Sequence, residues 1–139
     1  MYSSPCKLQI AIHSAVIEKG TDMNGLSDPY VKVYENSKKL LHTTAVQEDT
    51  LSPVWEEIFT TTSYCGNTLT FKIYDKDLVT DDYLGECQID LQPDLDKESG
   101  ENMPPIKSFD EMVVDFYNKK KPKKGNGKLT ITVRHLGFA

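Results

Sequence analysis

The chain has 139 residues and a formal net charge of −5, with 27% of its residues charged and 38% hydrophobic. These values are typical of one soluble globular domain over residues 1–139, and they exclude a disordered or membrane-spanning chain. The acidic balance also argues against nucleic acid as a partner, because nucleic-acid-binding domains carry a basic surface.

Eight short segments alternate between apolar and polar residues, which is the pattern of half-buried β-strands. In chain order they are residues 8–13, 30–34, 40–47, a segment that begins near 55, 69–74, 83–91, 112–117 and 129–134. Residues 92–110 form a longer connection, with room for a short helical turn. The pattern predicts an all-β fold, an eight-stranded antiparallel β-sandwich.

The cysteines and the first residues of the chain indicate a compartment. Cys6, Cys65 and Cys87 are odd in number and form no Cys-x-x-Cys pair, as is typical of reduced thiols in a cytoplasmic protein. The first residues lack the apolar core of a signal peptide, and no apolar run is long enough for a membrane-spanning helix. We therefore expect a cytoplasmic protein whose contact with a membrane is peripheral.

Two connections between predicted strands carry more carboxylates than a turn needs. One is Asp22 to Tyr30, Asp-Met-Asn-Gly-Leu-Ser-Asp-Pro-Tyr, and the other is Asp75 to Gly85, Asp-Lys-Asp-Leu-Val-Thr-Asp-Asp-Tyr-Leu-Gly. Carboxylates this close repel one another unless a cation lies among them, and Asp oxygens are the usual donors to calcium. If successive strands are antiparallel, both connections lie at the same end of the sandwich, together with the lysine-rich turn at residues 119–124. The sequence therefore predicts a Ca²⁺ site at that end.

These motifs, with Thr-Leu-Ser-Pro-Val-Trp-Glu-Glu at residues 50–57, resemble those of the C2 domain family in order and spacing over almost the whole chain. The resemblance implies the circularly permuted, type II form of an eight-stranded sandwich. It also implies a calcium-binding cup at one end and docking onto anionic phospholipid membranes, so that the protein becomes a peripheral membrane protein when it binds calcium.

The resemblance assigns metal ligands residue by residue. They are Thr21, Asp22, Asp28, Asp75, Lys76, Asp77, Asp81 and Asp82, with Thr21 and Lys76 acting through their backbone carbonyls. Asp81 and Asp82 compete for one role, because the second acidic connection is one residue shorter than in conventional protein kinase C or the synaptotagmins. Counted back from Gly85, Asp82 is the better match.

Apolar and basic residues near the acidic connections are candidates for contact with a membrane. They are Met23, Leu78, Val79, Lys119, Lys120, Lys121, Lys123 and Lys124. The apolar residues are predicted to insert into the membrane from the tips of the loops, and the lysines to attract anionic lipid. By contrast, residues 43–49 lack the lysine cluster with which kinase-type relatives bind phosphoinositides, so that specificity is not expected here.

Other functions have less support in the sequence. An EF-hand is excluded, because Ser27 and Val33 occupy the sixth and twelfth positions counted from Asp22, where Gly and Glu are required. No nucleophile motif or phosphate-cradling loop is present, so we do not expect an enzyme. The alternative to calcium-dependent membrane binding is a calcium-independent module that binds protein partners.

Overall fold

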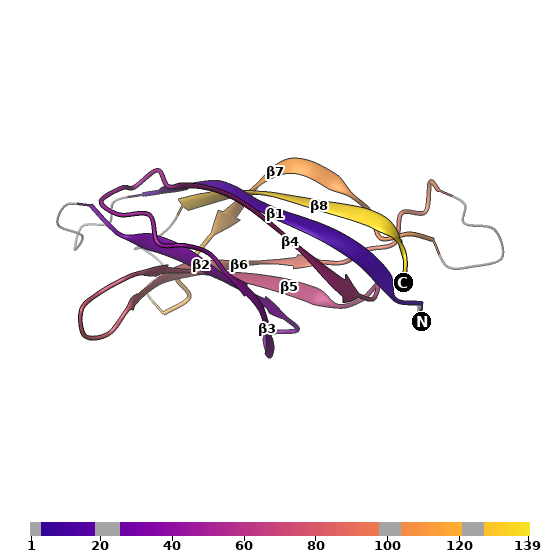
Figure 1. The fold of residues 1–139 in the computed structure, drawn as a ribbon, viewed down its shortest axis with the longest axis horizontal. Coiled ribbons are helices and arrows are strands. Elements are labelled where there is room, and N and C mark those ends of the chain that lie inside the picture. Colours follow the sequence, from indigo (N-terminus) through magenta and orange to yellow (C-terminus); the bar gives the residue numbers. More distant parts are fainter. Residues whose placement is uncertain (1–3, 19–25, 98–103, 121–126) are drawn as a thin grey trace.

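A computed structural model describes residues 4–18, 26–97, 104–120 and 127–139. These residues form two four-stranded antiparallel sheets that pack face to face (Figure 1). The strands are β1 (Cys6–Ile17), β2 (Pro29–Glu35), β3 (Lys39–Thr43), β4 (Val54–Ser63), β5 (Thr68–Asp75), β6 (Asp82–Asp90), β7 (Phe109–Phe116) and β8 (Gly127–Phe138). The predicted eight-stranded antiparallel β-sandwich is confirmed.

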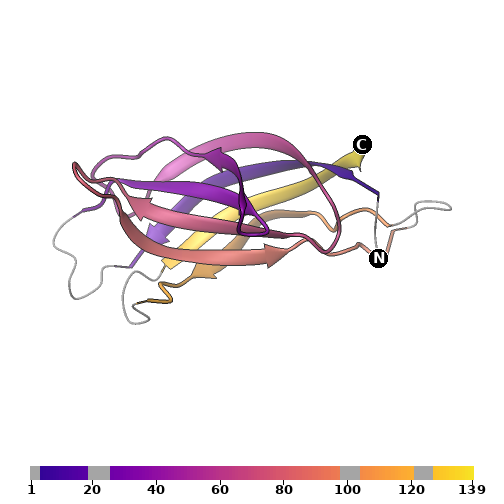
Figure 2. The same cartoon turned by 90° about the horizontal axis from the view of Figure 1, so that it is seen from below.

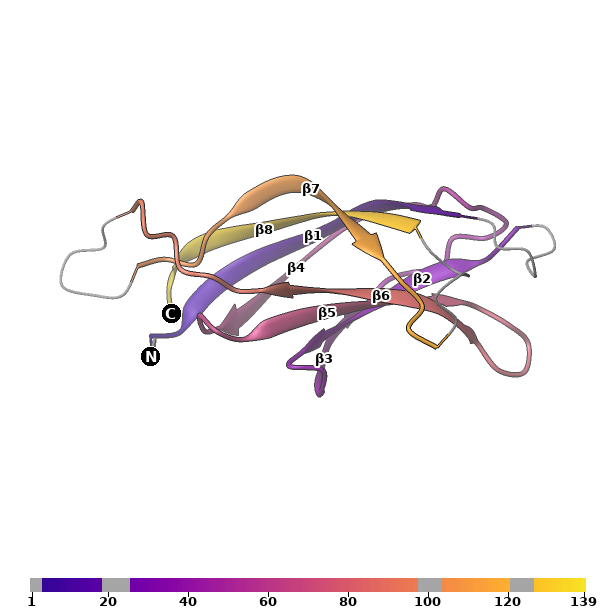
Figure 3. The same ribbon diagram turned by 180° about the vertical axis from the view of Figure 1, so that it is seen from behind.

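One sheet has the strand order β4-β1-β8-β7 and the other has the order β3-β2-β5-β6 (Figure 3). The last strand, β8, lies between β1 and β7, as the type II topology requires. Alternate residues of each central strand point into the space between the sheets. Leu8 and Ile10 of β1 meet Phe71 and Ile73 of β5 in one buried cluster, and each of the four is 0% exposed. Burial of this alternating apolar face holds the two sheets together.

Strand β1 is longer than the alternation in the sequence predicted. Its residues in the core cluster are Cys6, Leu8, Ile10 and Ile12 up to His13, and then Ala15 and Ile17. The pairing of β1 with both neighbours shifts between Ile12 and Ser14, which is a β-bulge. A bulge inserts one extra residue, so the buried positions pass from even to odd numbers and the strand continues with its apolar side chains still inward.

The strands bring distant connections to one end of the sandwich, which we call the acidic end because Asp28, Asp75 and Asp82 lie there. Pro29 at the start of β2 pairs with Asp75 at the end of β5, and Asp75 pairs with Asp82 at the start of β6. Figure 2 shows the β5–β6 connection at the left and both chain termini at the right. We call the opposite end of the sandwich, where the chain termini lie, the terminal end. There the Ala139 N–H donates to the Pro5 carbonyl at 2.9 Å.

One expectation for the connections is wrong, and another is tested only in part. The third strand ends at Thr43, so residues 44–47 are not strand as predicted and belong to the connection that crosses to the other sheet. In the described parts of the β6–β7 connection Pro93 and Ile106 form a β-bridge and there is no helical turn, while residues 98–103 lie outside the described residues. Ile106 is 1% exposed and joins the core, which explains why this connection is anchored. Within the described residues, no helix has the length and apolarity to span a membrane.

Candidate metal-binding site

Asp28, the last residue before β2, is hydrogen-bonded through its backbone N–H and carbonyl to the end of β5 at the acidic end. The Asp28 N–H donates to Asp75 Oδ1 at 2.8 Å, and the Lys76 N–H donates to the Asp28 carbonyl at 2.9 Å. The second of these bonds extends the antiparallel ladder of β2 and β5 by one step beyond Pro29 and Asp75, and the first holds the Asp75 carboxylate against Asp28. Two carboxylates that are far apart in the sequence are therefore held next to each other by regular strand pairing.

The carboxylates of the acidic end repel one another. Burial raises the pKa of Asp75, and the charges of Asp28, Asp82 and Asp77 raise it further, while the hydrogen bond from the Asp28 N–H opposes the shift. A raised carboxyl pKa means that the charged form is disfavoured where it stands. The charges of Asp28, Asp77 and Asp82 thus all act on the Asp75 carboxylate, and we call these four carboxylates the cluster.

Asp81 makes different contacts from the four carboxylates of the cluster. It accepts a hydrogen bond from the Tyr30 hydroxyl and another from the Asp77 N–H at 3.0 Å. Its Oδ1 also lies 3.7 Å from Lys76 Nζ. These donors, the Tyr30 hydroxyl first, lower the pKa of Asp81. Asp82 stands opposite Asp75 in the β5–β6 ladder instead.

A third connection, residues 44–53 between β3 and β4, also reaches the acidic carboxylates. The Asp49 N–H donates to Asp28 Oδ1 at 2.7 Å, and the Thr50 N–H donates to the Ser27 carbonyl at 2.8 Å. The Ser27 hydroxyl is buried and has no hydrogen-bond partner among the residues that the structure describes. Sequence analysis missed this contribution, because a backbone donor leaves no mark in the residue types.

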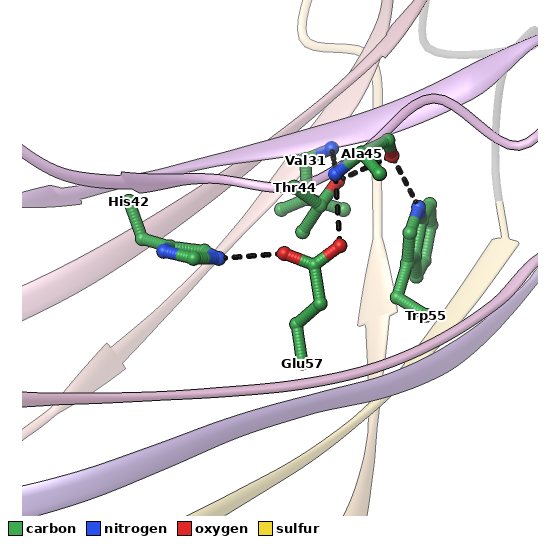
Figure 4. Close-up of polar contacts among 6 residues, drawn as sticks. All are labelled: Val31, His42, Thr44, Ala45, Trp55 and Glu57. Carbon is green, nitrogen blue, oxygen red and sulfur yellow. Dashed lines mark hydrogen bonds and ion pairs between the residues drawn. The ribbon is translucent and has the colours of Figure 1, made fainter.

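A network of polar side chains fixes the 44–53 connection against both sheets (Figure 4). Glu57 on β4 accepts from the Ala45 N–H at 2.8 Å, and its other oxygen lies 2.9 Å from His42 Nε2. Trp55 Nε1 donates to the Ala45 carbonyl at 2.9 Å, and the Val31 N–H donates to Thr44 Oγ1 at 2.8 Å. The network therefore sets where Asp49 meets Asp28. Trp55 itself is buried in the core.

Leu78 and Val79 form an apolar tip on the acidic end. They lie midway along the β5–β6 connection and are 101% and 94% exposed. Leu26, which precedes Ser27, is also 60% exposed. Leu26 was not selected from the sequence, although an apolar residue inside an acidic connection is the same signal that selected Leu78.

The described part of the lysine-rich turn lies beside β6. Lys119 Nζ is 4.0 Å from Glu86, and Lys119 and Lys120 line one side of a surface cavity of about 400 Å³. The rest of its lining comes from Lys72, Tyr74, Tyr83 and Glu86. Tyr74 precedes Asp75 and Tyr83 follows Asp82, so Lys119 and Lys120 are neighbours of the acidic end. This is the end at which the alternating direction of successive strands predicted the lysine-rich turn.

The donor chemistry fits calcium, although not every expected ligand is described. Thr21, Asp22, Met23, Lys121, Lys123 and Lys124 lie outside the described residues. Among residues 4–18, 26–97, 104–120 and 127–139, no group of three or more His, Cys, Asp or Glu side chains is arranged so that it could hold a metal ion. Here the carboxylates of Asp28 and Asp75 accept from backbone N–H groups. All the donors are nevertheless oxygen atoms, and several belong to carboxylates that lie close together. Oxygen donors of this kind are the ones that Ca²⁺ prefers.

The comparisons with known proteins now decide the family. A family model described as "C2 domain" matches residues 6–106. The chain belongs to the C2 domain family. A solved structure of one C2 domain of a plant extended synaptotagmin 1 superposes on it with a TM-score of 0.73, covering 99% of this chain and 98% of that one at 20% identity.

This C2 domain is also similar to parts of two longer proteins. It is 41% identical over 71 residues to extended synaptotagmin-1 of Homo sapiens, a match over 50% of this chain and 6% of that protein. A calcium-bound pair of C2 domains from extended synaptotagmin 2 superposes with a TM-score of 0.69 at 23% identity, covering 99% of this chain and 48% of that one. The chain thus spans only a small part of the length of such relatives.

Proposed function

We propose that this C2 domain binds Ca²⁺ at its acidic end and then attaches to anionic phospholipid membranes. The observation that carries the proposal is the placement of carboxylates from two connections side by side: the Asp28 N–H donates to Asp75 Oδ1 at 2.8 Å, and Asp75 pairs with Asp82 in the β5–β6 ladder. The proposed ligands are the carboxylates of Asp22, Asp28, Asp75, Asp77 and Asp82 or Asp81, and the carbonyls of Thr21 and Lys76. The calcium-bound state of the extended synaptotagmin 2 domains supports the choice of metal.

The carboxylates act as an electrostatic switch. In the absence of a cation, five Asp side chains at one end repel the phosphate and carboxylate groups of an anionic membrane. When bound, calcium supplies positive charge and open coordination positions for oxygens of the lipid headgroup. The Asp side chains hold that charge at the end of the sandwich that also carries the exposed tip. Attachment therefore depends on calcium because the same residues repel the lipid without it.

Apolar and basic side chains strengthen the attachment. Leu78 and Val79 are exposed enough to enter the interface between headgroups and acyl chains, and Leu26 and Met23 would join them from the first acidic connection. Each apolar side chain contributes at most about 1.5–3 kcal/mol. Lys119 to Lys124 attract anionic lipid from a distance, by about 1 kcal/mol per Lys near the surface. The buried, free thiols agree with a cytoplasmic location.

Co-sedimentation with liposomes tests this function. The protein is mixed with vesicles of phosphatidylcholine with and without phosphatidylserine, in calcium or in a chelator. We expect sedimentation only with phosphatidylserine and calcium together, and we expect Asp75→Asn with Asp77→Asn to abolish it. The matched control is Asp94→Asn with Asp96→Asn, which changes the charge equally at the terminal end. Equal binding in calcium and chelator would refute the proposal and favour the calcium-independent alternative.

A further inference from the structure

The carboxylate of Asp81 forms hydrogen bonds that tie the β5–β6 connection to a neighbouring strand; we call this set of contacts the clamp. One of its oxygens accepts from the hydroxyl of Tyr30 on β2, and the other accepts from the Asp77 N–H at 3.0 Å. The second oxygen is also 3.7 Å from Lys76 Nζ. Both oxygens of the side chain are therefore engaged by groups of the protein itself, and one of those groups belongs to a neighbouring strand.

Tyr30 is held in place by packing, so it can fix the position of Asp81. It is 6% exposed, it pairs with Tyr74 in the β2–β5 ladder, and the two rings stack with their centroids 5.5 Å apart. Burial, followed by the hydrogen bond to Asp81, raises the pKa of Tyr30. The same bond lowers the pKa of Asp81. In this contact the Tyr30 hydroxyl donates and the Asp81 carboxylate accepts.

Asp81 and its neighbour Asp82 therefore have separate surroundings. Asp82 faces Asp75 and belongs to the set of charges that act on it, whereas Asp81 is surrounded by donors. Building on the proposed function, we infer that Asp81 is a positioning residue, which clamps the connection to Tyr30, and that Asp82 supplies the last carboxylate to the metal. This assigns different roles to two adjacent residues of the same type.

The clamp acts on both functional parts of the connection. It holds the Asp77 N–H, and Asp77 Oδ1 in turn accepts from the Leu78 N–H at 2.6 Å. The orientation of the Asp77 carboxylate and the direction of the Leu78–Val79 tip are consequently set before any ligand arrives. Preorganisation of this kind improves binding because less conformational freedom is lost when the ligand arrives.

Amide hydrogen exchange in the calcium-free protein tests the clamp by itself. Asp81→Ala removes both acceptors, and Tyr30→Phe removes one donor while keeping the aromatic stack. We expect exchange at the Asp77 amide to become at least about tenfold faster in both variants. Asp81→Asn keeps an acceptor for this amide and should restore its protection, and Asp82→Asn should leave it unchanged. Exchange as slow in Asp81→Ala as in the unaltered chain would overturn the clamp.

Calcium titration of the same variants tests the division of roles. Asp82→Asn should weaken calcium binding by at least about tenfold, because the site loses a charged ligand. Asp81→Asn should bind close to the unaltered chain, while Asp81→Ala should lie between the two. Equal losses in Asp81→Asn and Asp82→Asn would make Asp81 a direct ligand and overturn the inference. If the unaltered chain takes up no calcium, the proposed function fails, and the amide exchange still decides whether Asp81 clamps the connection.

Discussion

Asp75 is the residue at which folding and metal binding make opposite demands. Its side chain is drawn into the sandwich by the β5 pairing and accepts a hydrogen bond from Asp28, yet three other carboxylates act against its charge. Burial and like charges both favour the protonated form, so the folded state of the metal-free protein holds this proton more tightly than the unfolded chain. A residue kept in such a place is better explained by binding than by stability.

The double variant Asp75→Asn with Asp77→Asn should fold more stably than the unaltered chain when calcium is absent. Since the pKa of Asp75 is raised in the folded state, folding stability falls as pH rises through the range above the ordinary pKa of Asp, and at neutral pH the full penalty is present. Asn keeps the acceptor for the Asp28 N–H and removes the charge. Urea unfolding at pH 7 in a chelator measures the gain; a clear loss of stability in the variant would contradict this account.

The thiols should be almost inert in the folded protein. Cys6, Cys65 and Cys87 are all buried, and burial raises the pKa of each, for Cys87 to about 12. At pH 8 only about one part in ten thousand of Cys87 is then thiolate, the reactive form. A disulfide reagent such as Ellman's should titrate the thiols slowly in buffer and rapidly in guanidinium chloride. Fast reaction of the folded protein would show that these side chains are reached by solvent.

At the scale of elements, the 44–53 connection is a structural part of the candidate site. It crosses from one sheet to the other, and its bonds from Asp49 to Asp28 and from Thr50 to Ser27 hold the segment that leads into β2. Glu57 and Trp55 set its path through Ala45. A change on β4 should therefore be detected at a carboxylate that it does not touch.

Glu57→Ala should lower the free energy of unfolding by about 0.5–1.5 kcal/mol, the usual net worth of a hydrogen bond, and should also weaken calcium binding. Glu57→Gln retains an acceptor for the Ala45 N–H and should recover most of both losses. Glu48→Ala, a change at an exposed residue of the same connection, is the control. Urea unfolding followed by the fluorescence of the single tryptophan, Trp55, measures stability. If Glu57→Ala behaves as Glu48→Ala does, the network is not what holds the connection.

The basic turn and the apolar tip should contribute to membrane binding in different ways. Changing Lys119, Lys120, Lys121, Lys123 and Lys124 to Gln should weaken binding to phosphatidylserine vesicles and flatten its dependence on salt, because charge attraction is screened. Leu78→Ser with Val79→Ser should weaken binding with little change in the salt response. Calcium affinity in solution should stay the same in both variants.

The control for the basic turn is Lys97→Gln with Lys107→Gln, two lysines in the β6–β7 connection. Vesicle binding is measured over a series of salt concentrations for all variants. Undiminished binding of the Lys-to-Gln variant at low salt would show that the turn is only solvated.

The alternation of apolar residues predicted the strands because burial on one face imposes it, and in β8 the alternate residues Leu129, Ile131 and Val133 are all 0% exposed. Because successive strands were predicted to run in opposite directions, the sequence also predicted which connections lie at the same end of the sandwich. The bulge at His13 was not predictable, because it depends on how two neighbouring strands pair with β1. Carboxylates in the candidate site were visible as residue types, whereas the Asp49 amide was not. The distinction between Asp81 and Asp82 also needed the structure, since it depends on the position of the Tyr30 hydroxyl.

For the whole molecule, calcium should act as a link between the two sheets. Asp22 follows β1 of one sheet, and Asp28, Asp75 and Asp82 flank or belong to strands of the other. A ligand that gathers these residues binds the folded state alone, because the unfolded chain does not hold them together. Binding therefore adds to the stability of the entire sandwich and not only to that of the loops.

Calcium should raise the melting temperature of the unaltered domain markedly. At a hundredfold excess over Kd, linkage adds about 2.7 kcal/mol per site to the free energy of unfolding. Calorimetric scans in a chelator and in millimolar calcium measure the shift. The variant Asp75→Asn with Asp77→Asn should melt at the same temperature in both conditions, and an unaltered domain that does the same would indicate loops that have lost the metal.

The neighbouring positions of the two termini make the response of the domain to force depend on direction. Cys6 of β1 lies opposite Phe138 of β8 at the terminal end. From there β1 leads away along the sandwich, and β8 returns beside it in the antiparallel direction (Figure 1). Tension applied between the termini therefore loads the outermost hydrogen bonds first and opens the ladder one rung at a time. A pull between the termini and the Leu78–Val79 tip instead runs along the strands and loads many rungs together, in shear. A domain attached to a membrane at its acidic end and held at its terminal end would thus be pulled along its strands, the direction in which many hydrogen bonds resist the force together.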